Sequence, residues 1–443
     1  MRFPSKGPIA MRLREAQKAF IDTLQYRTFL YFWNESNPEN GLVRDRSTKN
    51  SPASTAATGF GVAAWIVGAE HGWVTRAQAR QRVINLLRFL ISARQSPDSM
   101  ATGYQGFYYH FLDIKTGLRV WHSELSSIDT AWLLAGIRFA RQYFNGSHPA
   151  EQQIRQLADQ ITFNVNWDFL TITDAGKYHG TIALGWFPEK GLHHIGWIGY
   201  NEGQYLYVLA AGSGYKNAEN AYQVWLSTYE WFEPYEHLGH VGFAPLFGHQ
   251  YTQIFLDLRG LVDDYMKQKK IDYFENSRRA TLTQWQYAKQ NPLNWQGYDS
   301  LTWGWTACDG PGPKFNFDKR VFHNYSARGI IGTQYIQLDD GTIAPTAVGG
   351  SIVFAPEIVL NTLMSMYERF KQNGIWGKYG FVDAFNLTAN WFDKEYLGID
   401  QGPILLMIEN LRSALIWKYS MEDKVIQHGL ERLNFTPINN IEQ

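Results

Sequence analysis

The sequence has almost no cysteine. Cys308 is its single thiol in 443 residues, so the chain has no internal disulfide and no site built from several thiolates. This usage fits a reducing compartment. An excess of charge of one sign is also lacking, because 41 Lys and Arg balance 41 Asp and Glu. Proteins that bind nucleic acids usually carry a basic surplus, so we expect no nucleic-acid partner.

Long apolar runs are lacking as well. The N-terminal stretch MRFPSKGPIAMRLREAQKAF has no apolar core of signal-peptide length, and no later run is long enough to span a membrane. By this criterion we expect a cytoplasmic protein without a membrane partner; a removed leader, or a start at Met11, is the alternative. No repeat or low-complexity linker divides the sequence. Residues 1–443 are therefore expected to form a single domain.

Aromatic residues, in contrast, are abundant. They make up 16% of the chain, with 17 Trp, 25 Tyr and 27 Phe. Many of them must fill the core. Others lie beside glycine and proline in expected loops, in the clusters QGFYYHF, LGWFPEKG and LTWGWTACDG. The C–H faces of pyranose rings stack on flat aromatic rings, so a sugar-binding cleft would explain these clusters. Packing in the core is the other open interpretation.

Helical periodicity dominates the chain. Helices are predicted at residues 12–33, 55–71, 75–94, 127–145, 151–165, 202–213, 217–231, 249–268, 276–290, 356–372 and 403–420, with a short one near 383–391. Alternation typical of strands is confined to GFYYHFLD, GKYHGTIALGWF and GTQYIQLDDGTIAP, which we interpret as short β-hairpins in the loops.

Two kinds of helix can be distinguished. STAATGFGVAAWIVGA and DTAWLLAGIRFA carry Ala and Gly nearly all round, as helices packed on both sides must, whereas TRAQARQRVINLLRFLISARQ has a charged face. About six pairs of an inner and an outer helix favour an all-α fold, the (α/α)6 barrel or toroid. An irregular α bundle is the alternative.

Three of the apolar helices begin with an acid. Glu202 follows Asn201, a good N-cap residue, and Asp129 stands at capping-box spacing after Ser126. Asp400 is expected to be an N-cap itself. Each acid alone is explained by the helix dipole, which contributes up to about 1 kcal/mol. In the barrel, however, inner helices run parallel, so these acids would line one cavity, and glycoside hydrolysis needs two such carboxyls, one protonated and one ionised.

A more specific signal comes from stretches spread over most of the chain: GLVRDRS, IDTAWLLAGIRFARQYF, YNEGQYLYVLAAGSG, PLFGHQYTQIFLDLRG, DYFENSRRAT, WGWTACDGPGP, DGTIAPTAVGGSIVFAPE, YGFVDAFN and YLGIDQGPILLMIENLRS. In this order they resemble the bacterial glucoamylase-like family. Its characterised enzymes are endo-β-1,2-glucanases of glycoside hydrolase family 144, related to the glucoamylase-like domain of cyclic β-1,2-glucan synthases. The resemblance implies an (α/α)6 barrel and inverting hydrolysis without metal or cofactor. It also implies internal cleavage of β-1,2-glucan to short sophoro-oligosaccharides.

The resemblance also implies roles for individual residues. The acid of the YNE motif falls on Glu202, which we expect to be the general acid. Asp129 in the DTA motif is the first candidate for the base, followed by Asp400 in GIDQG and then by Glu124. Expected substrate contacts, taken from polar family motifs and from tryptophans, are Arg46, Trp197, His249, Gln250, Tyr251, Trp303, Trp305 and Asp309.

Arg259, Asn276 and Arg278 lie in further polar motifs of the family. For the two arginines, hydrogen bonds to sugar hydroxyls and salt bridges inside the protein are equally open.

Two features depart from the family pattern. Cys308 stands where a serine is expected in TASDGP, and the export signal that many members carry is not seen, although the resemblance alone would place the protein in the periplasm. A transglycosylase acting on β-1,2-glucan chains and a catalytically inactive carbohydrate-binding protein are the alternative functions. In each case we expect a monomer whose partner is a glucan oligo- or polysaccharide.

Overall fold

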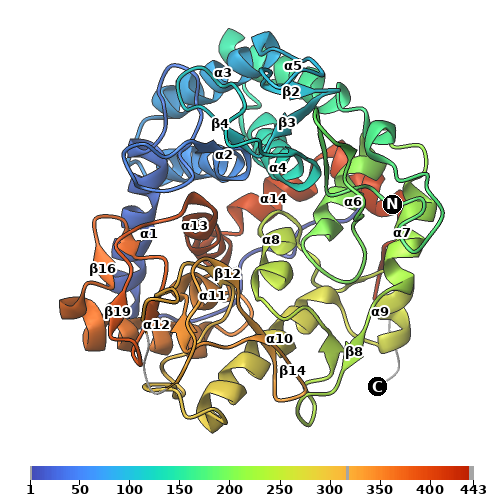
Figure 1. The fold of residues 1–443 in the computed structure, drawn as a ribbon. Coiled ribbons are helices and arrows are strands. Elements are labelled where there is room, and N and C mark those ends of the chain that lie inside the picture. Colours follow the sequence, from blue (N-terminus) through green and yellow to red (C-terminus); the bar gives the residue numbers. More distant parts are fainter. Residues whose placement is uncertain (1, 316–318, 439–443) are drawn as a thin grey trace.

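The computed structural model describes residues 2–315 and 319–438, which form a helix-rich structure with short strands (Figure 1). Helices near the centre of the view alternate along the chain with helices near its edge. The inner helices are α2 (Thr55–Glu70), α4 (Ser127–Tyr143), α6 (Gly203–Gly212), α8 (Phe247–Phe255), α11 (Pro345–Gly349) and α13 (Gly398–Arg412). The outer helices are α1 (Glu15–Asn34), α3 (Arg76–Ser92), α5 (Pro149–Phe163), α7 (Ala218–Ser227), α10 (Tyr273–Gln290) and α12 (Pro356–Phe370). Shorter helices are α9 (Asp264–Lys269), α14 (Leu415–Met421) and α15 (Lys424–Arg432), with 3-10 turns at Trp167–Leu170 and Lys371–Asn373.

Burial separates the two sets of helices. Every residue of α2 from Thr55 to Gly68 is buried, whereas α5 buries residues one turn apart, among them Ile154, Ala158 and Ile161. A helix rich in Ala and Gly can be packed on all sides, while an amphipathic helix leaves one face in water. The predicted contrast between the two kinds of helix is confirmed.

Two glycines set the distance between α2 and α4. A Cβ on Gly59 would lie 2.1 Å from the carbonyl oxygen of Trp132, and a Cβ on Gly136 would lie 2.0 Å from that of Gly59. Both distances are far inside van der Waals contact, so no larger residue fits at either position. The two helices therefore pack backbone against backbone, which fixes the start of α4 relative to α2.

The strands are short, antiparallel and confined to the segments that join helices. The largest sheet contains β2 (Gly103–Tyr104), β3 (Phe107–Tyr109), β5 (Leu125–Ser126), β6 (Gly185–Phe187) and β7 (Gly191–Leu192), in that spatial order. A second sheet contains β15 (Thr342–Ile343), β18 (Phe385–Asn386) and β19 (Trp391–Phe392). The paired strands are β1 (Ala53–Ser54) with β4 (Phe111–Leu112), β8 (Trp231–Phe232) with β9 (His240–Val241), β10 (Leu261–Val262) with β20 (Thr436–Pro437), β11 (Ala307–Cys308) with β12 (Ser326–Ala327), β13 (Gly329–Ile331) with β14 (Tyr335–Leu338), and β16 (Trp376–Gly377) with β17 (Gly380–Phe381). β3, β6 and β14 lie in the three segments predicted to form strands.

Three helical predictions differ most from the structure in type or extent. The short helix expected near 383–391 is instead the β18–β19 hairpin, whose turn holds Asn390 at a positive φ of 48°. The helix predicted at 249–268 ends at Phe255, because Leu256 adopts an extended conformation. The helix predicted at 403–420 begins earlier, at Gly398, and is interrupted at Ala414, where φ is 56°. Local backbone conformation, which apolar periodicity does not report, decides all three.

The interior is shared by both ends of the chain. A continuous cluster of buried apolar side chains has members from Phe3 to Phe435, and Cys308, Ala344 and Ala384 form a small separate cluster. Within residues 2–315 and 319–438, no helix combines the length and the apolar character needed to cross a bilayer.

Candidate active site

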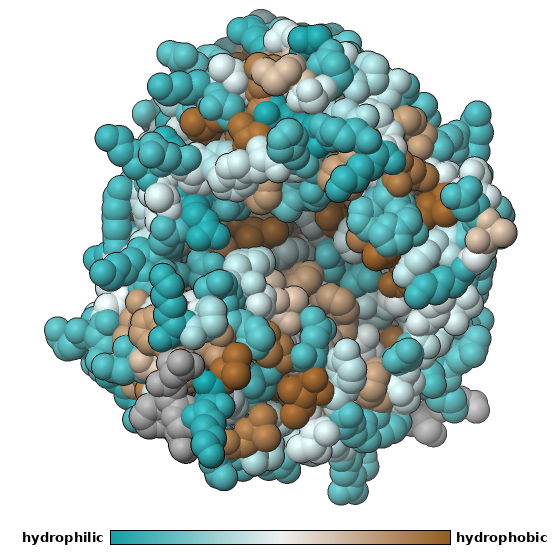
Figure 2. Space-filling model, viewed as in Figure 1, coloured by the Kyte–Doolittle hydropathy of each residue, from teal (hydrophilic) through white to brown (hydrophobic). Residues whose placement is uncertain are grey.

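A cavity of about 560 Å³ opens where the N-terminal ends of α4, α6 and α13 meet. Asp129 in the first turn of α4, Glu202 directly before α6, and Asp400 in the first turn of α13 line this cavity. Figure 2 shows a hollow near the centre of the face that lies over the inner helices. The predicted meeting of three acids from distant segments is confirmed, and the volume is that of a small-molecule site.

Glu202 has no positively charged partner among the described residues. It is the N-cap of α6, which begins one residue later than predicted. Asn201, the predicted N-cap, accepts the N–H of Gly203 with its Oδ1 at 2.9 Å. In the described part of the chain, Glu202 Oε2 is buried without a hydrogen-bond partner. Burial, with a smaller contribution from the charge of Asp129, raises the pKa of Glu202 to about 7. About half of the Glu202 side chains therefore carry a proton at neutral pH.

Trp197 ties the start of α6 to the start of α4. Its indole Nε1 donates to Ser127 Oγ at 2.9 Å, and a Cβ on Gly203 would lie 3.0 Å from the indole ring. Glycine at position 203 thus lets the indole pack against the first turn of α6. Trp197 is buried and does not line the cavity, so the expectation that it stacks on a sugar is wrong. Its contacts position Glu202 instead.

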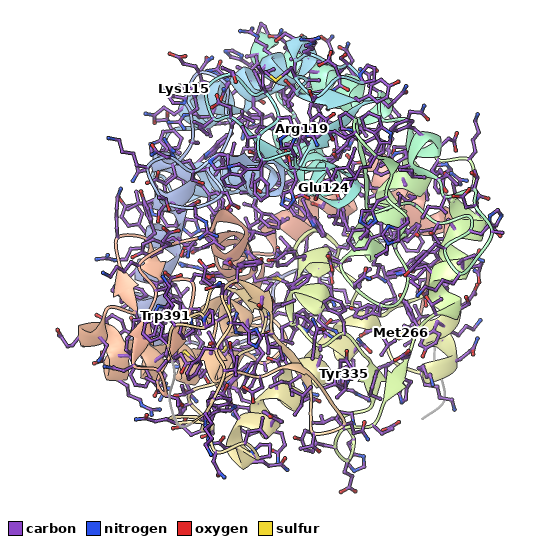
Figure 3. The ribbon with its side chains drawn as sticks, in the orientation of Figure 1. Lys115, Arg119, Glu124, Met266, Tyr335 and Trp391 are labelled. Carbon is purple, nitrogen blue, oxygen red and sulfur yellow. The ribbon has the colours of Figure 1, made fainter. Side chains whose placement is uncertain are left out.

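His110 lies between two acids at the cavity wall. Its Nδ1 is 2.9 Å from Glu124 Oε1, and its Nε2 is 3.6 Å from Asp129 Oδ1. Burial disfavours the imidazolium, but the charges of Asp129 and Glu124 outweigh burial and raise the pKa of His110 to about 9. His110 is therefore a cation at neutral pH. Glu124 lies close to α4 (Figure 3) but reaches the cavity only through His110.

Asp129 combines a capping contact with the contact to His110. The Oγ of Ser126 accepts the N–H of Asp129 at 3.1 Å, as predicted for an N-cap, and donates its own proton to the Asp129 carboxylate. Burial raises the pKa of Asp129, and the charge of His110 opposes this. Asp129 is thus a buried acid whose ionised form has both a cation and a hydroxyl donor beside it.

Asp400 lies inside its helix rather than at the cap. The N-cap of α13 is Leu397, which corrects the prediction that Asp400 caps the helix. Asp383 is its close neighbour, and the two carboxyl groups hydrogen bond to each other. Burial raises the pKa of Asp400 to about 7, and burial together with the charge of Asp400 raises the pKa of Asp383 well above its usual range. Two acids this close do not both ionise readily, so the pair retains a proton.

Aromatic side chains form much of the remaining wall. They are Phe111, Trp121, Trp132, Phe247, Tyr251 and Tyr325. Trp121 is 64% exposed and Tyr325 is 51% exposed, so both rings offer a free face at the mouth of the cavity. The cavity therefore joins carboxyl groups in two protonation states to flat apolar surfaces, which is the combination that a carbohydrate site requires.

The predicted substrate contacts divide into two groups. Arg46 and Tyr251 line the cavity, and the Tyr251 hydroxyl donates to the carbonyl oxygen of Ile399, next to Asp400. Asp309 lies behind Arg46, with its Oδ2 3.0 Å from Arg46 Nη1, and does not line the cavity itself.

The other predicted contacts are in the interior. Trp303 and Trp305 are 0% exposed, and His249 and Gln250 are 1% exposed. Their polar atoms bond inside the protein; for example, Gln250 Nε2 donates to the carbonyl oxygen of Ala347 at 2.7 Å. The expectation that these four residues contact substrate is wrong, because side chains buried this deeply stabilise the packing of inner helices and offer no face to a ligand.

The two further arginines also lie away from the cavity. Arg259 pairs with Asp257 at 2.7 Å, and its guanidinium carbon is 4.5 Å from the centre of the Trp417 ring. Arg278 is at the surface, 3.4 Å from Glu275. The salt-bridge alternative therefore applies to Arg259.

Several residues of the cavity were not predicted. His110 lies within QGFYYHF, a segment chosen for its aromatics, and Asp45 lies within GLVRDRS. The pairing of β1 with β4 brings His110 to the cavity, and that pairing leaves no periodic pattern in the sequence. Trp121 and Tyr325 come from loops, where only their exposure distinguishes them from core aromatics.

Two groups of side chains in residues 2–315 and 319–438 have the arrangement to hold a metal ion. In each group, one ligand atom from each residue lies within 4.8 Å of the others; the groups are His110, Glu124 and Asp129, and Asp309, Asp383 and Asp393. The first group contains its own cation, the His110 imidazolium. The second consists of acids alone.

Comparison with known proteins places this geometry in a family. A family model described as putative glucoamylase matches residues 194–424. A putative glucoamylase from Bacteroides uniformis, solved as a crystal structure, is 34% identical, with 97% of this chain and 99% of that chain covered and a TM-score of 0.81. An endo-β-1,2-glucanase from Chitinophaga pinensis, in complex with sophorotriose and glucose, is 28% identical, with 96% of this chain and 99% of that chain covered and a TM-score of 0.78.

A curated relative is the exo β-1,2-glucooligosaccharide sophorohydrolase (non-reducing end) of Parabacteroides distasonis, 29% identical over 447 residues. The match covers 93% of this chain and 57% of the relative, so the chain spans little more than half the length of that protein. The family match includes Glu202 and Asp400, two of the four acids that line the cavity. The crystal structure from Bacteroides uniformis covers nearly the whole fold. The chain belongs to the glucoamylase-like family.

Proposed function

We propose that the chain is a glycoside hydrolase that cleaves β-1,2-glucan internally to short sophoro-oligosaccharides, with inversion at the anomeric carbon. The observation that carries this proposal is the buried Glu202 carboxyl, whose Oε2 has no hydrogen-bond partner in the described structure, at a cavity that also holds Asp129 and Asp400. The relatives named as β-1,2-glucan hydrolases support the linkage.

Glu202 is the proposed general acid. Protonation of the glycosidic oxygen needs a carboxyl that keeps its proton near neutral pH but gives it up when the bond breaks. A pKa of about 7 meets both requirements, and the free Oε2 is available to a substrate oxygen. No hydrogen bond inside the described structure has to be broken for that contact to form.

Asp129 is the proposed base. Its ionised form is favoured by the His110 imidazolium at 3.6 Å, whereas Asp400 shares a proton with Asp383. Asp400 is therefore the second candidate, and Glu124, which is bound to His110, is the third. An inverting mechanism places a water molecule between acid and base, which requires roughly 6.5–9.5 Å between the two carboxyl groups in the substrate complex.

We also propose that the alternating inner and outer helices form an (α/α)6 barrel, that the chain is one domain and that it acts as a monomer. The paired order of the helices and the continuous apolar cluster support the first two statements. Size-exclusion chromatography with light scattering tests the third.

Exo action is the second candidate, because the curated relative is named an exo-acting sophorohydrolase. The two modes differ in their early products. Endo cleavage of a long β-1,2-glucan gives a ladder of sophoro-oligosaccharides from the first minutes, while exo action gives sophorose alone.

The test is incubation with β-1,2-, β-1,3-, β-1,4- and α-1,4-glucans, followed by chromatography of the products and NMR of their first anomer. We expect products from the β-1,2-glucan only, with the α anomer formed first. New, longer chains would indicate a transglycosylase instead. Binding of β-1,2-glucan with no product from any of the four glucans would contradict the hydrolase and indicate a carbohydrate-binding protein.

A further inference from the structure

We infer that a second cavity, which adjoins the first, binds glucose units of the same β-1,2-glucan chain that lie farther from the cleaved bond. We call it the outer cavity. Its volume is about 510 Å³, close to the 560 Å³ of the cavity that holds Glu202. Both volumes are typical of small-molecule sites. The inference rests on the proposed function, because it assigns the outer part of the same substrate.

Asn201 and Phe243 connect the two cavities. Asn201 lines the outer cavity, and the next residue, Glu202, lines the first. Phe243 lines the outer cavity and Phe247 lines the first, with 5.2 Å between their ring centres. Both rings are partly exposed. A glucan chain bound at Glu202 can therefore continue over these two rings into the outer cavity.

Two hairpins form another part of the wall of the outer cavity. Phe232 ends β8 and Tyr335 begins β14, and their ring centres are 6.1 Å apart. Gln334 Nε2 donates to the carbonyl oxygen of Glu233 at 2.9 Å, which attaches the β13–β14 hairpin to the segment that follows β8. The strands β8 and β14 accordingly lie side by side near the lower edge of the view (Figure 1), and Tyr335 is labelled there in Figure 3.

Gly242 allows Phe232 to pack against the backbone. A Cβ at position 242 would lie 2.4 Å from the Phe232 ring and 2.7 Å from Cδ1 of Ile331. Both distances are far inside van der Waals contact, so a larger residue would displace the ring. The Phe232 ring is therefore held in place, and its remaining surface lines the outer cavity.

The outer cavity offers flat apolar rings to a ligand. Tyr335 is 47% exposed, and Phe232 and Phe243 are partly exposed. The face of an exposed aromatic ring provides a large apolar contact area, against which the C–H faces of a pyranose ring can stack. Together with Phe247, these rings continue the aromatic lining of the first cavity.

The polar groups of the outer cavity favour a neutral ligand with many hydroxyl groups. Glu230 and Gln337 line it, and the Glu230 side chain has neither a hydrogen-bond nor an ion-pair partner within residues 2–315 and 319–438. Its carboxylate can therefore accept hydrogen bonds from sugar hydroxyls. None of the described residues that line this cavity is Lys or Arg, so an anionic ligand would find no positive charge there.

The outer cavity predicts a preference for long chains. A short oligosaccharide can occupy the first cavity without reaching the outer one, whereas a long chain contacts both. We therefore expect a long β-1,2-glucan to bind more tightly than sophorotriose. The difference should depend on side chains of the outer cavity, Tyr335 and Glu230 among them.

The test measures the affinities of sophorotriose and of a long linear β-1,2-glucan by calorimetry, in the full-length Glu202→Gln protein so that the chains stay intact. In Tyr335→Ala, the ratio of the affinity for the long glucan to that for sophorotriose should fall about 10-fold, because an exposed stacking ring is lost. Tyr26→Ala is the matched control, since Tyr26 is 42% exposed but lines neither cavity, and it should leave the ratio unchanged.

A second variant gives an independent measurement on a different kind of side chain. Glu230→Ala removes a hydrogen-bond acceptor and should lower the same ratio about fivefold. A lower ratio in either variant, with an unchanged melting temperature, supports the inference. An unchanged ratio in both would overturn it, and so would a long glucan that binds no more tightly than sophorotriose. Two sophorotriose molecules per protein chain, one of them lost in Tyr335→Ala, would overturn it in favour of a separate glucan site.

The inference and the proposed function can fail separately. If the wild type cleaves β-1,2-glucan while the ratio is the same in Tyr335→Ala, Glu230→Ala and Tyr26→Ala, the inference fails and the proposed function stands. If the wild type cleaves no glucan but the ratio falls in Tyr335→Ala, the proposed function fails and the outer cavity remains part of a glucan-binding site.

Discussion

Replacement of Glu202 by glutamine is the sharpest test of the proposed chemistry. The pKa of Glu202 is raised from 4.5 to about 7, so about half of the side chains are protonated at pH 7, against about one in 300 for an ordinary glutamate. Glutamine keeps the shape and removes the transferable proton. General acids contribute about 10²- to 10⁴-fold, so we expect kcat on β-1,2-glucan to fall by that factor while binding of sophorotriose is retained.

The same substitution has a stability signature. A raised pKa in the folded state means that Glu202 favours folding below pH 4.5 and that this contribution is lost as pH rises through about 7. The glutamine variant lacks this loss. The free energy of unfolding of the variant minus that of the wild type should therefore rise by about 2.5 kcal/mol from pH 5 to pH 8. This value follows from about 1.4 kcal/mol per pKa unit.

The assays are initial rates from pH 5 to 9 and urea unfolding at pH 5 and pH 8. Wild-type activity should decline above pH 7 as Glu202 loses its proton. Glu236→Gln is the control, since Glu236 is 89% exposed and lies outside the cavity, and it should change neither quantity. Full activity of Glu202→Gln would refute the acid assignment, and equal pH dependence of unfolding in variant and wild type would refute the burial argument.

Three further substitutions test other parts of the site. His110→Ala removes the imidazolium beside Asp129 and should lower kcat about 10- to 100-fold with little change in KM; an unchanged kcat in initial-rate assays would remove Asp129 as the favoured base. Trp121→Ala removes an exposed ring at the cavity mouth and should raise KM about 10-fold, equivalent to about 1.4 kcal/mol, without a change in melting temperature; an unaltered KM would show that the ring does not contact the glucan. Trp303→Ala leaves a cavity in the core and should cost about 3–5 kcal/mol in urea unfolding, whereas a raised KM with unchanged stability would restore its role as a substrate contact.

The sequence contained enough to predict five of the six inner helices, all except α11, and the meeting of three of their acids. Helix type follows from apolar periodicity, and the start of α4 follows from the Ser126 cap. Parallel inner helices then place Asp129, Glu202 and Asp400 at one cavity, although nothing local connects these residues. This part of the site could be predicted because each acid stands near the start of an apolar helix, even though the starts of α6 and α13 differ from the predicted ones.

The aromatic contacts could not be predicted in the same way. Trp303 and Trp305 stand beside glycine in the sequence, as loop residues exposed to sugar would, but both are buried. Burial of a loop depends on what packs over it, and no local pattern encodes that. The protonation of Glu202 was undecided for a similar reason: the helix dipole and burial oppose each other, and only the structure shows that burial dominates.

The contact between Gly59 and Gly136 has an evolutionary consequence. The acid Asp129 is anchored by two touching helix backbones, whereas Trp121 and Tyr325 are carried by loops at the rim. Mutations in those loops can thus alter which glucan is accepted while the proton-transfer groups keep their positions. Substitution of either glycine would instead push the two helices apart and lower activity on every substrate. Sequence differences among relatives should therefore concentrate in the loops at the rim and leave Gly59 and Gly136 unchanged.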